Sequence, residues 1–171
     1  MFRSMRRTKQ ILSSSECIAI LERSTSGVLA VLGDDGFPYT IPLNYTYSDH
    51  KLFFHSAKTG HKIDAILANP KVSFCVIDQD QIVPEEYTSY FRSVIAFGKA
   101  RILDTAPEIR TALELLAMKY SSSQTEEHRN HAIEKDFKMV CIIEVTIEHL
   151  SGKEAIELVK MKKSKEINSL L

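Results

Sequence analysis

The first third of the chain changes from a helical to a strand-like pattern of apolar residues. Residues 13–23 place three serines ahead of apolar residues at helical spacing, which predicts a short capped helix. The apolar run 27–32 is followed by the turn-forming residues 33–36, which is typical of a β-hairpin. Residues 39–47 (YTIPLNYTY) and 51–55 (KLFFH) are rich in β-branched and aromatic types and predict two further strands. Together these strands form a predicted meander.

Pro42 stands inside the predicted strand 39–47. Because proline has no backbone N–H to donate to a ladder, we expect this strand to be interrupted or to lack a partner there. A gap in strand pairing is a place where a ligand can meet the backbone.

The middle of the chain adds a crossing helix and a second pair of strands. Residues 61–68 (HKIDAILA) have helical spacing and are stopped by Asn-Pro, and residues 71–77 (KVSFCVI) alternate as a strand. The polar stretch 78–89 predicts a long loop. Residues 90–103 then predict one long strand, with Gly98 as a candidate β-bulge.

The last third begins with helical patterns. Residues 107–120 predict a helix that opens on proline, and residues 125–135 predict a second helical piece. Residues 139–147 (MVCIIEVTI) predict a buried strand, and residues 153–160 predict a further helix. The lysine-rich residues 161–171 predict a loose tail.

This order of elements predicts a mainly β, α+β architecture. The strands follow one another in largely antiparallel succession, and the inserted helices do not alternate strictly with them, which argues against a doubly wound sheet. A small barrel with accessory helices fits better. A chain of 171 residues is also the size of one domain. We therefore expect a single domain over residues 1–160, followed by the tail.

Composition and charge narrow the possible partners. The chain has 22 Lys+Arg and 22 Asp+Glu, so no net charge draws it to nucleic acid or to an anionic membrane. No stretch approaches the roughly 18 continuous apolar residues of a membrane span, and the N-terminus carries no signal-like apolar run. We expect a cytoplasmic protein without a nucleic-acid or membrane partner.

The candidate metal ligands and thiols form no convincing site. Cys17, Cys75 and Cys141 are odd in number and never arranged as C-x-x-C, so we expect buried thiols and neither a disulfide framework nor a zinc site. His128 and His131 have a spacing that could hold a metal. Their surroundings are polar all round, which favours a solvated helix face, and we expect no metal.

The densest group of chemically active residues is the segment 55–62 (HSAKTGHK), where a strand ends and a helix begins. A helix N-terminus offers unpaired N–H groups, and Ser56, Lys58 and Lys62 add a hydroxyl and cations, which together suit a phosphate. The alternative is a solvated turn capped by Thr59. No G-x-x-x-x-G-K-[ST] or G-x-G-x-x-G motif is present, so the common nucleotide fingerprints do not apply, and no G-x-S-x-G elbow supports a hydrolase.

Four segments in this order and spacing resemble a known family: 26–30 (SGVLA), 37–45 (FPYTIPLNY), 52–62 (LFFHSAKTGHK) and 69–74 (NPKVSF). They look like the flavin-binding split-barrel family related to pyridoxamine phosphate oxidase, and most closely its nitroimidazole resistance (Nim-type) branch. The resemblance covers nearly the whole chain. It implies a six-stranded antiparallel split β-barrel that forms a homodimer, with one FMN in each of two clefts between the subunits.

The resemblance also implies roles for particular residues. Residues 55–57 and 60–62 would hold the ribityl phosphate. The strand around Pro42 would follow the isoalloxazine edge, and the first hairpin would support the ring. A segment of the long strand would approach from the partner subunit. In sequence order, the implied FMN-binding residues are Val28, Leu29, Pro42, Leu43, Asn44, Tyr45, His55, Ser56, Ala57, Gly60, His61, Lys62, Arg92, Ser93 and Val94. His55 is the candidate catalytic residue.

The implied function is an FMN-dependent oxidoreductase that reduces a small electron-poor substrate such as a nitroimidazole. Vitamin-B6 oxidases end in an arginine-rich segment that grips the substrate phosphate, whereas this chain has no arginine after Arg129. Oxidation of pyridoxamine phosphate is therefore not expected. The alternative function is a flavin- or haem-binding protein without turnover of its own, acting as a carrier or sensor.

Overall fold

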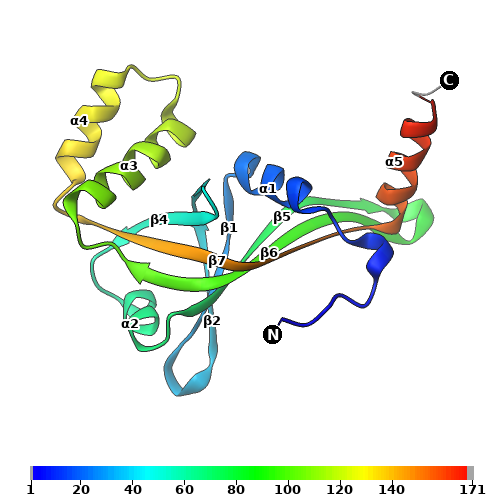
Figure 1. Ribbon diagram of the computed structural model, residues 1–171, viewed down its shortest axis with the longest axis horizontal. Helices are drawn as coiled ribbons and strands as arrows, with labels where there is room; N and C mark the ends of the chain where they lie inside the picture. Colours follow the sequence, from blue (N-terminus) through cyan, green and yellow to red (C-terminus); the bar gives the residue numbers. More distant parts are fainter. Residues whose placement is uncertain (1, 169–171) are drawn as a thin grey trace.

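The computed structural model describes residues 2–168, which form a mixed α+β fold with one seven-stranded antiparallel sheet and five α-helices (Figure 1). The elements are α1 (Ser14–Arg23), β1 (Ser26–Leu32), β2 (Pro38–Asn44), β3 (Thr46–Ser48), β4 (Lys51–Ala57), α2 (His61–Ala68), β5 (Lys71–Val83), β6 (Thr88–Ile102), α3 (Ala106–Ser121), α4 (Glu126–Asp136), β7 (Val140–Glu154) and α5 (Ile156–Asn168). The strand order is β2-β1-β5-β6-β7-β4-β3. No helix within the described residues is long and apolar enough to cross a membrane.

The sheet has seven strands where six were predicted, because the expected strand 39–47 divides at Tyr45. The phenol oxygen of Tyr120 lies 2.9 Å from the backbone N of Tyr45 and 2.6 Å from its carbonyl oxygen, so both backbone groups meet a side chain instead of a neighbouring strand. The Tyr45 side chain is fully buried and its hydroxyl donates to the Leu21 carbonyl at 2.8 Å. A contact with a residue 75 positions away therefore makes the break.

The two halves of this divided strand lie at opposite edges of the sheet. The sheet must therefore curl around the core, in which Tyr45, Phe54 and Phe74 pack with centroid separations of 4.7 to 6.3 Å. Pro42 pairs with Val28 of β1, and β2 has no strand on its other side. The strand is thus continuous and paired at Pro42, so the expected interruption or missing partner there is wrong. Proline is tolerated because β2 is an edge strand, in which one side of the backbone needs no ladder donor.

The predicted long loop 78–89 is wrong. Strands β5 and β6 continue pairing from Gln79↔Arg92 to Val83↔Thr88, and the turn is only the short helical segment Pro84–Glu86 with Tyr87 in the left-handed region (φ 50°). The paired ends of the two strands, residues 79–83 and 88–92, form a two-stranded ribbon, which we call the β5–β6 ribbon. Side chains on both of its faces are largely exposed, so the alternation of apolar and polar residues that marks a strand is lost. The predicted bulge at Gly98 is confirmed, because the β6–β7 register shifts between Phe97 and Gly98.

The end of the chain is also more ordered than expected. Strand β7 continues to Glu154, beyond the predicted end at residue 147, and α5 runs from Ile156 to Asn168 through most of the predicted loose tail. The Lys162 ammonium, 2.7 Å from Glu154 and 2.5 Å from Glu16, ties α5 to β7 and α1. Residues 169–171 of the predicted tail lie outside the described residues.

The helices occupy positions that the sequence pattern anticipated. Helix α1 has the predicted serine cap, in which the Ser13 hydroxyl accepts from the Glu16 N–H and the Glu16 carboxylate accepts from the Ser13 N–H. Helices α3 and α4 form a pair at one end of the sheet, opposite α5 (Figure 1). Ala112 and Leu116 of α3 pack against Phe53 of β4 and Ile142 of β7, so α3 covers the outer side of its own sheet. Cys17, Cys75 and Cys141 are free thiols, of which only Cys75 is partly exposed.

A network of alternating charges joins α1, the β5–β6 ribbon, β7 and α5. It runs from Arg23 through Asp78, Arg92, Glu154 and Lys162 to Glu16, with N–O distances of 2.5 to 3.2 Å. The hydrogen bond from Lys162, followed by that from the Ser13 backbone, lowers the pKa of Glu16 from 4.5 to about 2. Burial alone would raise the pKa of Asp78, but the hydrogen bonds from Arg23 and Arg92 together hold this pKa below its ordinary value.

This network predicts a specific loss of stability in acid. Because the pKa of Glu16 is lowered by folding, the stability it contributes is present above about pH 4.5 and is lost as the pH falls toward about 2. We expect the melting temperature of the wild type to fall over this range and that of Glu16→Gln, already lower at pH 7, to fall less. Thermal melts by circular dichroism between pH 7 and 2 measure this. An equal fall of the melting temperature in acid for the two proteins would contradict the prediction.

Candidate functional site

The junction between β4 and α2 presents a helix N-terminus without a cap. The N-cap is Gly60, with φ +127°, and no side chain caps the helix there. The Gly60 carbonyl accepts from the N–H groups of Ile63 and Asp64, at 2.8 and 3.2 Å. The N–H groups of His61 and Lys62, at the very start of the helix, have no such acceptor within it. The alternative in which Thr59 caps the turn is not what the structure has, so these donors remain available to an anion.

Ser56 supplies a second unsatisfied group beside this turn. It lies one residue before the end of β4, is only 9% exposed, and its hydroxyl has no hydrogen-bond partner among the described residues. Its neighbour in the ladder is Cys141 of β7, whose thiol is kept neutral because burial raises its pKa. A buried hydroxyl without a partner costs stability, so its presence here favours a ligand acceptor.

The first turn of α2 carries both signs of charge. Lys62 stands where a helix N-terminus favours an acidic residue, whereas Asp64 has the favourable sign. The His61 ring stacks on Tyr39 at 4.2 Å, and its Nε2 lies 3.7 Å from the Asp34 carboxylate. Lys62 has no ion pair among the described residues. Lys62 is therefore the cation, and His61 the backbone donor, that this turn offers to a phosphate.

The outer side of β2 and β4 carries a second candidate pocket. Asn44 and His55, both predicted site residues, line one cavity of about 540 Å³ under the α3–α4 pair. The other residues lining this α3–α4 cavity are Leu113, Leu116, Ala117, Tyr120, Ser121, Gln124, His128, Arg129, Ala132, Ile133, Asp136 and Val140. The contribution of α4 could not be predicted from the sequence, because its residues are polar on every side and are typical of a solvated helix. Among the side chains that the structure describes, no group of three or more His, Cys, Asp or Glu could hold a metal ion.

The remaining predicted residues divide into accessible and buried ones. Pro42 and Ala57 are exposed, Leu43 is half-buried, and Val28 is 38% exposed. Leu29, Tyr45 and Val94 are fully buried in the core, so their side chains can support a ligand site only from behind. Asn44 is oriented by its side-chain amide, which donates to the Thr25 carbonyl at 2.9 Å.

The predicted segment from Arg92 to Val94 lies far from the α2 turn within one chain. Arg92 pairs with Glu154 at one end of β7, whereas His55 pairs with Ile142 at the other. Twelve residues of strand, at about 3.3 Å each, separate these positions by roughly 40 Å along β7. Within one subunit this segment therefore does not join the site around His55 and Ser56.

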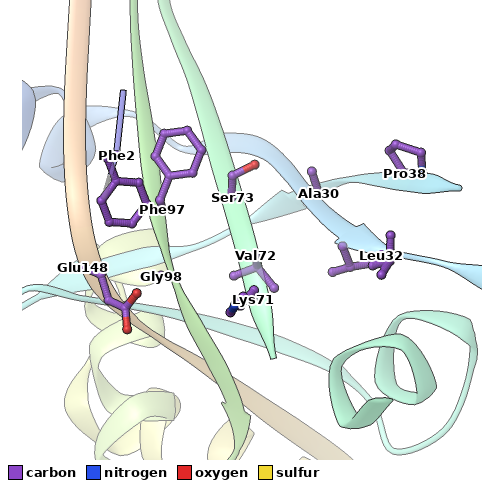
Figure 2. Close-up of a pocket in the computed structure, with 11 residues that line it drawn as sticks. Phe2, Ala30, Leu32, Pro38, Lys71, Val72, Ser73, Phe97, Gly98 and Glu148 are labelled. Atoms are coloured by element: carbon purple, nitrogen blue, oxygen red, sulfur yellow. The ribbon is translucent and has the colours of Figure 1, made fainter. Parts of the chain in front are cut away.

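A further cavity of about 560 Å³ lies over the outer face of the sheet. Figure 2 shows the rings of Phe2 and Phe97 beside each other on this face, with Ser73 and Ala30 on the neighbouring strands. The cross-strand rows Val28–Cys75–Ile95 and Ala30–Ser73–Phe97 place further side chains on it. We call this surface the outer sheet face.

Comparison with known proteins places these features in a family. The family model described as pyridoxamine 5'-phosphate oxidase matches residues 13–154. A candidate 5-nitroimidazole antibiotic resistance protein from Bacteroides thetaiotaomicron has a TM-score of 0.70 at 20% identity, over 84% of this chain and 86% of that one. An FAD-binding protein from Mesorhizobium loti has a TM-score of 0.59 at 28% identity, over 85% and 97%.

A third structure adds a different cofactor. The FAD and haem binding protein from Mycobacterium smegmatis has a TM-score of 0.68 at 17% identity, over 86% of this chain and 73% of that one. None of the curated proteins matches this sequence. At these identities, the structural similarity establishes the fold but not the chemistry of the site.

Proposed function

We propose that this chain, which belongs to the pyridoxamine 5'-phosphate oxidase family of flavin-binding split-barrel proteins, binds FMN and reduces a small electron-poor molecule such as a nitroimidazole. The observation that carries the proposal is the buried, unpartnered hydroxyl of Ser56 beside the uncapped N-terminus of α2, whose first turn includes Lys62. Each of these features is unfavourable in the empty protein, and a bound phosphate would satisfy both.

In this proposal the α2 turn binds the phosphate end of FMN. The Ser56 hydroxyl and the N–H groups of His61 and Lys62 donate to phosphate oxygens, and the Lys62 ammonium supplies the countercharge. Glycine is favoured at position 60 by the backbone conformation of the turn and not by lack of space. A Cβ there would meet nothing within 4 Å, but the φ of +127° would be strained for any other residue. Pro42, Leu43 and Asn44 follow the ring edge from β2.

The flavin would supply the redox chemistry, and the protein would supply binding and electrostatics. His55 is exposed at the end of β4 and lines the α3–α4 cavity, so its imidazole can contact a substrate or hold a proton there. A reduced nicotinamide is the proposed electron donor.

We further propose that the protein works as a homodimer. The outer sheet face carries apolar side chains of β1 and β6, including Val28, Ile95 and Phe97, that a two-fold partner could cover. In a dimer, the segment from Arg92 to Val94 could reach the partner's FMN, which it cannot do within its own chain. The mass in solution, expected to be twice that of the 19.4 kDa chain, measures this.

The test is reconstitution of the purified protein with FMN. We expect a yellow protein that releases FMN on heating, at about one FMN per chain, and NADH oxidation that accelerates with a nitroimidazole beyond the rate of free FMN. His55→Ala, compared with the wild type at equal FMN loading, should lose turnover, at least about tenfold if His55 acts as an acid or base. A protein that takes up no FMN overturns the binding proposal, and unchanged turnover in His55→Ala overturns the role of His55.

The second candidate is a flavin- or haem-binding protein without turnover. It is favoured by one observation: the imidazoles of His55 and His128 line the same α3–α4 cavity. Titration with haem, followed by its visible absorption in the wild type and in His128→Ala, distinguishes the two candidates. Stoichiometric haem binding that His128→Ala abolishes, with no accelerated NADH oxidation, would favour the carrier or sensor.

A further inference from the structure

The α3–α4 cavity is built from two surfaces of different character. The sheet contributes Asn44 and His55, and α3 contributes an apolar wall that includes Leu113 and Leu116. Helix α4 adds the polar side chains His128 and Arg129 near its beginning and Asp136 at its end. Its volume of about 540 Å³ is within the usual range for a small-molecule site.

Arg129 differs from the other arginines of the helices and strands. Arg23, Arg92, Arg101 and Arg110 each pair with a carboxylate at 3.2 Å or less. Arg129 is half-buried in the cavity wall and pairs with no carboxylate among the side chains that the structure describes. Its Nη1 donates to the Gln124 carbonyl, which fixes the side chain. Its Nε and Nη2 have no acceptor among the described residues, so part of the guanidinium fork is available to a ligand.

The cavity also carries a negative charge, but at a distance from Arg129. Asp136 is seven residues further along α4, which is about 10 Å along the helix axis. No ion pair joins the two side chains within the described part of the chain. The cavity is therefore polarised, with Arg129 and His128 at one end and Asp136 at the other. A ligand with a single acidic group would be bound in one orientation.

We infer that Arg129, assisted by His128, binds the carboxylate of an aromatic or heteroaromatic acid, and so selects acidic substrates over neutral ones. This inference rests on the proposed function, because it assigns the substrate class of the same site. A guanidinium whose Nε and Nη2 are both free binds a carboxylate through charge-assisted hydrogen bonds, whereas a neutral amide of the same shape gains much less. Arg129 is thus a specificity-determining residue and not a catalytic one.

The test compares 4-nitrobenzoate with the neutral 4-nitrobenzamide, which has nearly the same shape, by calorimetry on the FMN-loaded protein. The wild type should bind the acid roughly 10- to 100-fold more tightly than the amide. Arg129→Gln should remove this preference without changing amide binding, and Arg129→Lys should keep part of it. Lys135→Gln, which removes a positive charge from the same helix outside the cavity wall, should change neither affinity.

Several outcomes would overturn the inference. The first is that the wild type binds the acid and the amide with equal affinity, and the second is that it binds neither. The third is that Arg129→Gln weakens the binding of both compounds equally. The last outcome would mean that Arg129 only supports the fold of α4. Failure of the proposed function is distinguishable, because it appears earlier as a protein that does not load FMN.

Discussion

Replacing Lys62 with glutamate should weaken FMN binding about 100-fold while making the empty protein slightly more stable. The loss of affinity follows because the variant removes a charge-assisted hydrogen bond, worth about 1.5 to 3 kcal/mol, and adds a repulsive carboxylate beside the phosphate. The gain in stability follows because a negative charge in the first turn of α2 interacts favourably with the helix dipole, by about 0.5 kcal/mol. Fluorescence titration with FMN and urea unfolding of the apoprotein measure the two effects.

Two controls make this result specific to the phosphate. Riboflavin has the same ring without the phosphate, so its affinity should be unchanged in Lys62→Glu. Lys135 lies in the last turn of α4, where a cation is favourable, so Lys135→Glu should lower stability and leave FMN binding unaltered. If FMN and riboflavin lose affinity equally in Lys62→Glu, the phosphate is not bound at the α2 turn.

Much of the fold could be predicted because short-range patterns determine most of its helices and strands. The Ser13–Glu16 cap, the four helices α1 to α4 and the bulge at Gly98 follow from residues close together in the sequence. The predictions fail where contacts between residues far apart in the sequence determine the local structure. The Tyr45 break depends on Tyr120, and the end of α5 is tied down by ion pairs to Glu16 and Glu154.

The candidate site shows the same division between local and distant contacts. The turn between β4 and α2 could be predicted from eight consecutive residues, because helix-terminus chemistry is local. The α3–α4 cavity could not, because it combines His55 with Arg129, which is 74 positions later in the chain. No pattern within α4 distinguishes a helix that faces water from one that faces a cavity.

Replacing Gly98 with alanine should destabilise the protein by about 3 kcal/mol or more, which is the upper end of the cost of overpacking. A Cβ at this position would lie 2.1 Å from the backbone oxygen of Thr146 and 3.1 Å from a methyl group of Val145. A backbone oxygen cannot move aside as the end of a long side chain can, so the variant must shift the β6–β7 register at the bulge. Urea unfolding should show a lower midpoint, and the melting temperature should fall by roughly 10 °C.

Gly36→Ala is the matched control for Gly98→Ala. A Cβ at Gly36 meets nothing within 4 Å, and the only cost comes from its φ of +77°, which should amount to about 1 kcal/mol. Both variants add the same methyl group, and only Gly36→Ala has the φ cost, so the excess loss in Gly98→Ala is a lower limit on the cost of close packing in the centre of the sheet. If Gly98→Ala were no less stable than Gly36→Ala, strands β6 and β7 would not approach each other as closely at the bulge as the structure requires.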